Sequence, residues 1–304
     1  MFVIYEEGEK EKSCVISKNP VKLIKTDEHF LDAFFNDFEH ILENQKSKLT
    51  DLIIGMDSFT KSEGYISSPL SKFQSIFSHL LCYRFPKFEK VLTISALERN
   101  RQHTKNSSRM MAKFEAILKS RTVPLEVKNL RLTVFESQIF GILRFIRTKS
   151  LKGYRTLQFG LSEKKDTLAL GSISKCETLK NMEYLGIYDF VMTNPISDFL
   201  NIPELLLIRG SISRDDILII KQAFITNPRL KKWNLELGNS EGDEVIYEVL
   251  GRTFNGQPNK WFFETPNFKE TLSIHYTKRP TYTNIVFTRI NLIDVPKNAL
   301  IRCE

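Results

Sequence analysis

The sequence predicts an α/β fold in which strand–helix units stack as a solenoid on a parallel sheet, with an antiparallel cap at the C-terminal end. The first observation is the stretch Val127–Phe159, whose opening residues alternate apolar and polar side chains as a half-buried strand does. Apolar residues three or four apart then indicate a helix of about a dozen residues, and a short strand follows. A strand, a helix and a strand in so short a span predict a parallel pair with a crossover.

The second observation is a repeated pair of apolar residues that flank one intervening residue. These pairs are Leu52/Ile54, Leu92/Ile94, Leu132/Val134, Leu157/Phe159, Leu185/Ile187, Leu206/Ile208 and Leu235/Leu237. Repeats of roughly 20–45 residues with one strand and one helix each are typical of an irregular leucine-rich-repeat-like solenoid. The alternative is a doubly wound sheet, which we disfavour because no glycine-rich phosphate loop follows any of these strands.

The third observation is a change of pattern near the C-terminus. Segments 261–263, 271–276 and 285–292 alternate without helices between them, which predicts an antiparallel cap. We therefore divide the chain into residues 1–48 (an N-terminal hairpin and a capping helix), 49–250 (the repeat region) and 251–304 (the C-terminal β cap).

The remaining elements follow from local patterns. Strands are expected at 2–5, 14–17, 21–24, 52–54, 91–95, 183–188, 204–208 and 233–237. Helices are expected at 26–42, 70–85, 107–119, between Pro195 and Pro203, from Ser213 to Asn227 and at 243–250, with a short helix or turn at 166–174. The sequence Ser213-Arg214-Asp215-Asp216 is close to a capping box, with Ile212 and Ile217 placed as a hydrophobic staple.

Composition favours a globular protein without a membrane span. The chain has 304 residues, of which 41% are hydrophobic and 26% charged, and its net charge is +8. No run approaches the ~18 apolar residues of a spanning helix, and the N-terminus lacks the pattern of a signal peptide. The four cysteines are isolated, so reduced thiols and a cytoplasmic or nuclear location are expected.

The positive charge leaves nucleic-acid binding open but gives it little support. The densest basic patch consists of Arg144, Arg147, Lys149, Lys152 and Arg155. Cations at a helix C-terminus and in a solvated loop explain this patch without a ligand, and no docking motif accompanies it. Binding of nucleic acid is therefore disfavoured, and RNA binding through the basic surface is kept as the alternative function.

Catalytic signatures are absent from the sequence. It contains no phosphate-binding loop, no zinc-protease motif, no nucleophile elbow and no metal-ligand spacing. The five histidines are scattered, and Asp215 and Asp216 are explained by their place at a helix start. We expect no enzyme activity, no metal and no cofactor. An enzyme remains a third hypothesis because catalytic residues can assemble in space rather than in sequence.

Two regions of the chain resemble one protein family. The N-terminal part carries FVIYEEGEKEKSCVISK and FLDAFFNDFEHILENQKSKLTDLII, and the rest carries VKNLRLTV, ILRFI, LKGYRTLQF, DDILIIKQAFITNPRLKKWNLEL and IVFTRINLIDVPKNALI. These segments, in this order, resemble the large nematode group of F-box proteins with an FTH domain, whose core would span about 125–250. The resemblance implies a non-catalytic domain that holds a protein partner or substrate for an SCF-type ubiquitin ligase. In that family an F-box docks on the Skp1 adaptor of a cullin-RING ligase. No F-box precedes Met1 in this sequence, so contact with the Skp1–cullin machinery is expected only if an F-box is supplied upstream.

A partner-binding face is expected on the sheet, formed by the strand residues that lie between or beside the apolar pairs. The candidates are Thr93, Arg131, Thr133, Gln158, Leu207, Arg209, Asn234 and Glu236. As a set they are the predicted contact surface for an unidentified protein partner, although few residues of a real interface carry binding energy.

Overall fold

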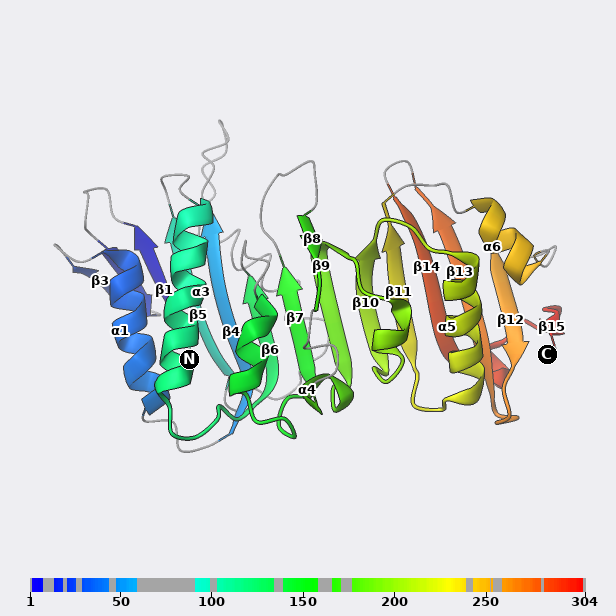
Figure 1. The fold of residues 1–304 in the computed structure, drawn as a ribbon, viewed down its shortest axis with the longest axis horizontal. Coiled ribbons are helices and arrows are strands. Elements are labelled where there is room, and N and C mark those ends of the chain that lie inside the picture. Colours follow the sequence, from blue (N-terminus) through cyan, green and yellow to red (C-terminus); the bar gives the residue numbers. More distant parts are fainter. Residues whose placement is uncertain are drawn as a thin grey trace.

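The structure is a computed structural model. It describes residues 2–7, 14–18, 21–25, 29–43, 48–58, 91–98, 103–133, 139–157, 166–170, 177–238, 243–251, 253, 259–279 and 282–302. One long sheet runs through this part of the chain (Figure 1), and its strands follow the order β15-β12-β13-β14-β11-β10-β9-β7-β6-β4-β5-β1-β2-β3, with β8 paired to β9.

The strands come from the whole length of the chain. They are β1 (Phe2–Glu7), β2 (Cys14–Lys18), β3 (Val21–Lys25), β4 (Leu49–Ser58), β5 (Val91–Glu98), β6 (Val127–Thr133), β7 (Gly153–Leu157), β8 (Asp166–Leu168), β9 (Tyr184–Met192), β10 (Glu204–Arg209), β11 (Lys232–Leu237), β12 (Lys260–Glu264), β13 (Glu270–Lys278), β14 (Thr283–Asn291) and β15 (Ile301–Arg302). The sheet is parallel from β1 to β11, and β12, β13 and β14 form the expected antiparallel part beside β11.

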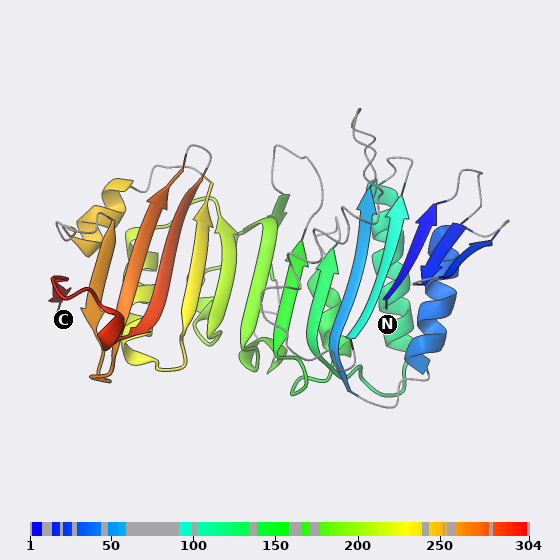
Figure 2. The same ribbon diagram turned by 180° about the vertical axis from the view of Figure 1, so that it is seen from behind.

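The longer described helices lie on one face of this sheet. The α-helices are α1 (Phe30–Glu43), α3 (His103–Ser120), α4 (Glu177–Lys180), α5 (Arg214–Thr226) and α6 (Asp243–Leu250). The 3-10 helices are η1 (Ile139–Phe145), η3 (Ile196–Phe199) and η4 (Leu292–Asp294). Figure 1 shows α1, α3, α5 and α6 in front of the strands, and the reverse view in Figure 2 shows the strands in front of these helices. The described part of the molecule therefore has two layers, in which α1, α3, α5 and α6 cover one face of the sheet.

The core lies between the two layers. In α1 the phenylalanines that follow the helical repeat are buried, and the ring of Phe38 lies 5.4 Å from that of Phe114 in α3. At the other end of the sheet, Phe224 of α5 lies 5.8 Å from Trp233 of β11 and 5.9 Å from Phe287 of β14, measured between ring centres. Each buried aromatic ring contributes about 2 kcal/mol before entropy is subtracted, so these rings attach α1 to α3, and α5 to the strands.

Local chemistry sets the bounds of α5 and α6 as expected. The Ser213 hydroxyl accepts a hydrogen bond from the Asp216 amide, and the Asp216 carboxylate accepts one from the Ser213 amide, which completes the capping box. Helix α6 ends at Leu250, and the φ of 73° at the following Gly251 is the left-handed conformation that glycine adopts without strain.

Two local predictions are wrong. The expected helix inside Val127–Phe159 is only the 3-10 helix η1. Leu125 forms backbone hydrogen bonds with residues 145 and 147, and this sheet-like pairing ends the helix after Phe145. The expected helix or turn at 166–174 begins instead with strand β8, which pairs in parallel with β9. That pairing is a tertiary contact and leaves no mark in the local sequence. Residues 171–174 and the expected helix at 70–85 lie outside the described residues.

The strand order agrees with stacked repeats over only part of the sheet. From β6 to β11 each strand on the main path pairs with the one before it, as successive repeats would. Strand β4, however, lies between β5 and β6, and β1 pairs with β5. The fold is thus a mixed α/β structure with one large open sheet, and the sheet continues across both expected domain boundaries.

Candidate functional site

The sheet face opposite the helices, which we call the bare face, carries polar and aromatic side chains. In β11, Trp233, Leu235 and Leu237 are buried against the helix layer, whereas Asn234 and Glu236 are partly exposed on the other side. The bare-face residues used below are Asp51, Asn129, Arg131, Arg155, Tyr184, Tyr188, Leu206, Ile208, Asn234, Glu236, Tyr282 and Asn284.

Strand register brings these side chains into rows across the sheet. Arg131 of β6 pairs with Arg155 of β7, which pairs with Gly186 of β9. Gly186 pairs with Leu206 of β10, which pairs with Asn234 of β11. A single row therefore runs from two arginines, across a glycine, to an apolar and then an amide side chain.

The β4–β7 end of the bare face holds a buried charge cluster. Asp51 is 3% exposed and Arg131 is 8% exposed. Burial raises the pKa of the Asp51 carboxyl, and the Arg131 guanidinium and a hydrogen bond with Asn129 offset only part of that rise. Burial, together with the like charge of Arg155, lowers the pKa of Arg131. The cluster contains two guanidiniums and one carboxyl that binds its proton more readily than usual. This end of the face is therefore positive.

Two tyrosines of β9 separate this charge cluster from the rest of the face. The Tyr184 and Tyr188 hydroxyls are 3.2 Å apart and hydrogen-bonded. The Arg155 guanidinium lies over the Tyr184 ring at 4.3 Å from its centre, which is a cation–π contact. A Cβ atom at Gly186 would come within 3.0 Å of the Tyr184 hydroxyl, so Tyr184 lies along its own strand in the space that glycine leaves. Burial raises the pKa of Tyr184, and Tyr188 adds to that rise, so this phenol is neutral.

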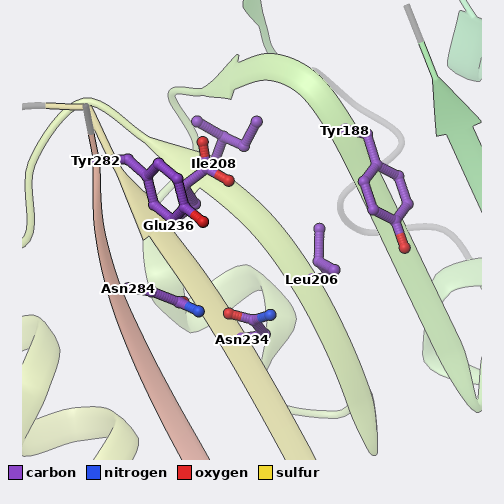
Figure 3. A pocket seen from close by; sticks show the side chains of 7 residues that line it. All are labelled: Tyr188, Leu206, Ile208, Asn234, Glu236, Tyr282 and Asn284. Carbon is purple, nitrogen blue, oxygen red and sulfur yellow. The ribbon is translucent and has the colours of Figure 1, made fainter. Parts of the chain in front are cut away.

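Beyond the tyrosines lies a hollow of about 220 Å³. Its lining comes from four strands and from the residue before β14, and it consists of Tyr188, Leu206, Ile208, Asn234, Glu236, Tyr282 and Asn284. Figure 3 shows Tyr188 on one side, Tyr282 and Glu236 on the other, and the amides of Asn234 and Asn284 near one another below them. A second depression of about 70 Å³ lies in the charge cluster, beside Asn129, Arg131, Arg155 and Tyr184. The bare face is thus hollowed at two places.

The structure places only some of the predicted site residues on this face. Arg131, Asn234 and Glu236 lie there, and the last two line the larger hollow. Thr93 and Thr133 belong to β5 and β6, but their side chains lie outside the described residues, as does the whole of Gln158.

The prediction for β10 is wrong by one residue. Leu207 was expected to face outward, but it is 0% exposed and lies in the core, whereas Leu206 and Ile208 line the hollow. The strand sequence Glu-Leu-Leu-Leu-Ile-Arg has four successive apolar residues, so alternation does not define which face each residue takes.

Arg209 also lies elsewhere than predicted. It pairs in register with Leu237, which is buried against the helix layer, and its Nη1 donates a 2.6 Å hydrogen bond to the carbonyl of Asn194. Arg209 therefore holds the segment between β9 and η3 in place, and charge reversal there would disturb the fold rather than probe a partner-binding surface.

Several bare-face residues were not singled out from the sequence. Tyr184 and Tyr188 alternate with Leu185 and Ile187, so the expected strand at 183–188 already contained the signal for an aromatic outer face. Tyr282 and Asn284 carried no such signal, because their position beside β11 depends on the antiparallel pairing of β11 with β14.

The dense basic patch is largely engaged with other side chains. Arg144 pairs with Glu115, Arg147 Nη1 lies 2.6 Å from Glu126 Oε1, and Lys152 Nζ lies 3.5 Å from Glu183 Oε1. Arg155 stacks on Tyr184 as described above. These contacts leave less positive charge for phosphate groups than the sequence alone indicates.

Comparison with known families adds one finding to this geometry. Residues 108–254 match the family model of the FTH domain. The resemblance to the FTH domain is confirmed over these residues, which run from within α3 to just past α6 and include the strands β6–β11. The FTH-matched region thus carries the two arginines, the two β9 tyrosines and most of the larger hollow. No curated protein and no solved structure matches the chain.

Two further findings apply to the described residues. None of the helices in them combines the length and the apolar character that a membrane crossing requires. No three histidine, cysteine, aspartate or glutamate side chains in them converge as metal ligands.

Proposed function

We propose that the chain is a non-catalytic protein-interaction domain that binds a protein partner across the bare face. The observation that carries the proposal is the one-sided layering: the helices cover one face, and the other presents arginines, tyrosines and a hollow over the middle strands. Charged, aromatic and apolar groups side by side, rather than one kind alone, are typical of protein-binding surfaces, and Tyr and Arg are enriched at their energetic centres.

The FTH match supports a more specific version of this proposal. The sequence resembles F-box proteins that carry an FTH domain. By this resemblance, the domain would hold a substrate or partner of an SCF-type ubiquitin ligase inside the cell. Contact with Skp1 and a cullin would require an F-box upstream. We further propose that β6–β11 act as leucine-rich-repeat-like units, because their sequential pairing gives a continuous row of outward positions.

A matched pair of charge reversals tests the proposal. Arg155→Glu changes the bare face, whereas Arg229→Glu changes an exposed arginine in the turn after α5. Immobilised wild-type protein and both variants would capture proteins from an RNase-treated cell lysate, with quantitative mass spectrometry as the readout and circular dichroism as the check on folding. We expect proteins that bind the wild type and Arg229→Glu but not Arg155→Glu. The same captured set for all three folded proteins would overturn the proposal.

The alternative, RNA binding, has a separate outcome. It predicts a salt-sensitive gel shift with single-stranded RNA near physiological ionic strength, because phosphate contacts release counterions. The ion pairs of the basic patch lead us to expect no such shift.

A further inference from the structure

The larger hollow on the bare face has the size of a site for one side chain. Its volume of about 220 Å³ is below the roughly 300–1,000 Å³ of sites for small molecules and cofactors. Its floor is apolar: Leu206 is half-buried there, and Ile208 is 3% exposed. A side chain that enters it would therefore have part of its length in contact with aliphatic groups.

The polar groups of this hollow include hydrogen-bond acceptors that lack a partner. The Oδ1 atoms of Asn234 and Asn284 are both buried, and neither has a hydrogen-bond partner. The carboxylate of Glu236 lies on the same strand and face as Asn234. None of the described lining residues is a lysine, arginine or histidine. Buried acceptors without donors are destabilising, so a donor-rich group that enters the hollow removes a penalty as well as making bonds.

We propose that this hollow binds an arginine side chain of the protein partner, an inference that rests on the proposed function. A guanidinium has five N–H donors and no acceptor, which matches two amide oxygens and a carboxylate. Its methylene groups pack on Leu206 and Ile208, and its plane stacks on the Tyr188 ring at the edge of the hollow.

The protein itself shows that such stacking fits this face. Arg155 lies over Tyr184, and Arg279 lies 5.5 Å from the centre of the Tyr282 ring. The Arg279 guanidinium already lies against the Tyr282 ring and adds positive charge at that edge of the hollow. The incoming guanidinium therefore stacks on Tyr188 instead, and Glu236 neutralises its charge. The two ends of the bare face then select different partner groups, an acid near Arg131 and Arg155 and an arginine in the hollow.

Methyl NMR of the full chain tests this assignment with a defined probe. The probe is N-acetyl-arginine amide, and the readout is the shift of the Leu206 and Ile208 methyl signals. N-acetyl-citrulline amide serves as a neutral probe of nearly the same shape. We expect saturable shifts with arginine and binding about tenfold or more weaker with citrulline, because hydrogen bonds from a charged donor are stronger than those from a neutral one.

Protein variants supply the second measurement. Glu236→Gln is expected to weaken the arginine probe about tenfold, whereas Glu248→Gln, an exposed residue of α6 in the helix layer, leaves it unchanged. Absence of saturable shifts, or equal binding of the citrulline or a lysine probe, would reject the arginine site. If face-dependent capture from lysate persists in that case, the protein-binding proposal stands alone. If arginine binds while capture ignores the face, the hollow is assigned and the proposed function fails.

Discussion

Gly186 controls how Tyr184 lies on the bare face. A methyl group there would come within 3.0 Å of the tyrosine hydroxyl, so the ring would have to rise from the sheet. It would then lose both the hydrogen bond to Tyr188 and the stacking of Arg155. At the residue scale, the Tyr184–Tyr188 pair between the two arginines and the hollow therefore depends on the absence of a side chain at Gly186.

We expect Gly186→Ala to lower the free energy of unfolding by about 1–2 kcal/mol, the sum of one hydrogen bond and one cation–π contact. Gly210→Ala is the control, because the nearest atom to its new methyl group is Val191 Cγ1 at 3.9 Å. Urea denaturation of both variants measures the difference. Equal stability of the two would show that Tyr184 contributes nothing in this position.

Asp51 makes a prediction about pH. Burial raises its pKa in the folded protein above the ordinary value of 3.8, so the folded state holds this proton more tightly than the unfolded state. The contribution of Asp51 to stability is therefore greatest below pH 3.8 and is lost as the pH rises through the folded-state pKa.

Asp51→Asn removes this dependence, since an amide does not titrate. We expect the stability of Asp51→Asn, relative to wild type, to increase as the pH rises from below 3.8 and then to level off. Denaturant unfolding between pH 3 and 7 measures the difference. A stability difference that is constant with pH, or that changes in the opposite direction, contradicts the raised pKa.

At the scale of the element, strand β10 separates two leucines that the sequence cannot tell apart. Leu207 is 0% exposed against the helix layer, and Leu206 lines the hollow. We expect Leu207→Lys to cost about 4 kcal/mol or to prevent folding, because it buries an ammonium group in the core. Leu206→Lys should cost about 1 kcal/mol or less, and its ammonium group lies among the acceptors of the hollow. Thermal unfolding distinguishes the two, and a reversed order would mean that β10 faces the other way.

Helix α5 gives the second prediction at this scale. Ser213→Ala removes the side chain that accepts from the Asp216 amide, and we expect a loss of about 1 kcal/mol in the free energy of unfolding. Ser213→Asp keeps an acceptor at the cap and should recover most of that loss. Ser211→Ala, an exposed serine two residues earlier, should have no effect. Stability measured by urea unfolding would contradict the capping role if Ser211→Ala and Ser213→Ala were alike.

The predictability of the elements depends on how local their determinants are. Helices α1 and α3 could be predicted from the apolar spacing within their own sequences, and α5 could be predicted from its capping box as well. The antiparallel cap was predictable from alternation without helices. Strand β8 was not, because it exists through its pairing with β9, and η1 was not, because sheet pairing at Leu125 and Ile146 ends it early.

At the scale of the whole molecule, the open α/β sheet could be predicted but its order could not. No local sequence pattern indicates that β4 lies between β5 and β6, or that β1 pairs with β5, because both arrangements depend on contacts between distant segments of the chain. The prediction of the site residues had the same limit, because some of these residues are brought together only by pairing of distant strands. Arg131, Asn234 and Glu236 were found because alternation in β6 and β11 is clear. Tyr282 and Asn284 needed the pairing of β11 with β14, and Leu207 was misplaced because β10 is apolar throughout.

The same strand order also sets the sequence of events during synthesis. Strands β7, β9, β10 and β11 each pair with the preceding one on the main path, so the nascent chain can add them in turn as they emerge from the ribosome. Strand β1 is synthesised first but cannot pair with β5 until β5 has been translated. Strand β11 keeps one unpaired edge until β14 has been translated. Unpaired edges recruit other chains. Strand β4 likewise lacks its neighbour β6 until residues 127–133 are made. The edges of β1, β4 and β11 are therefore the ones exposed longest to other chains during synthesis.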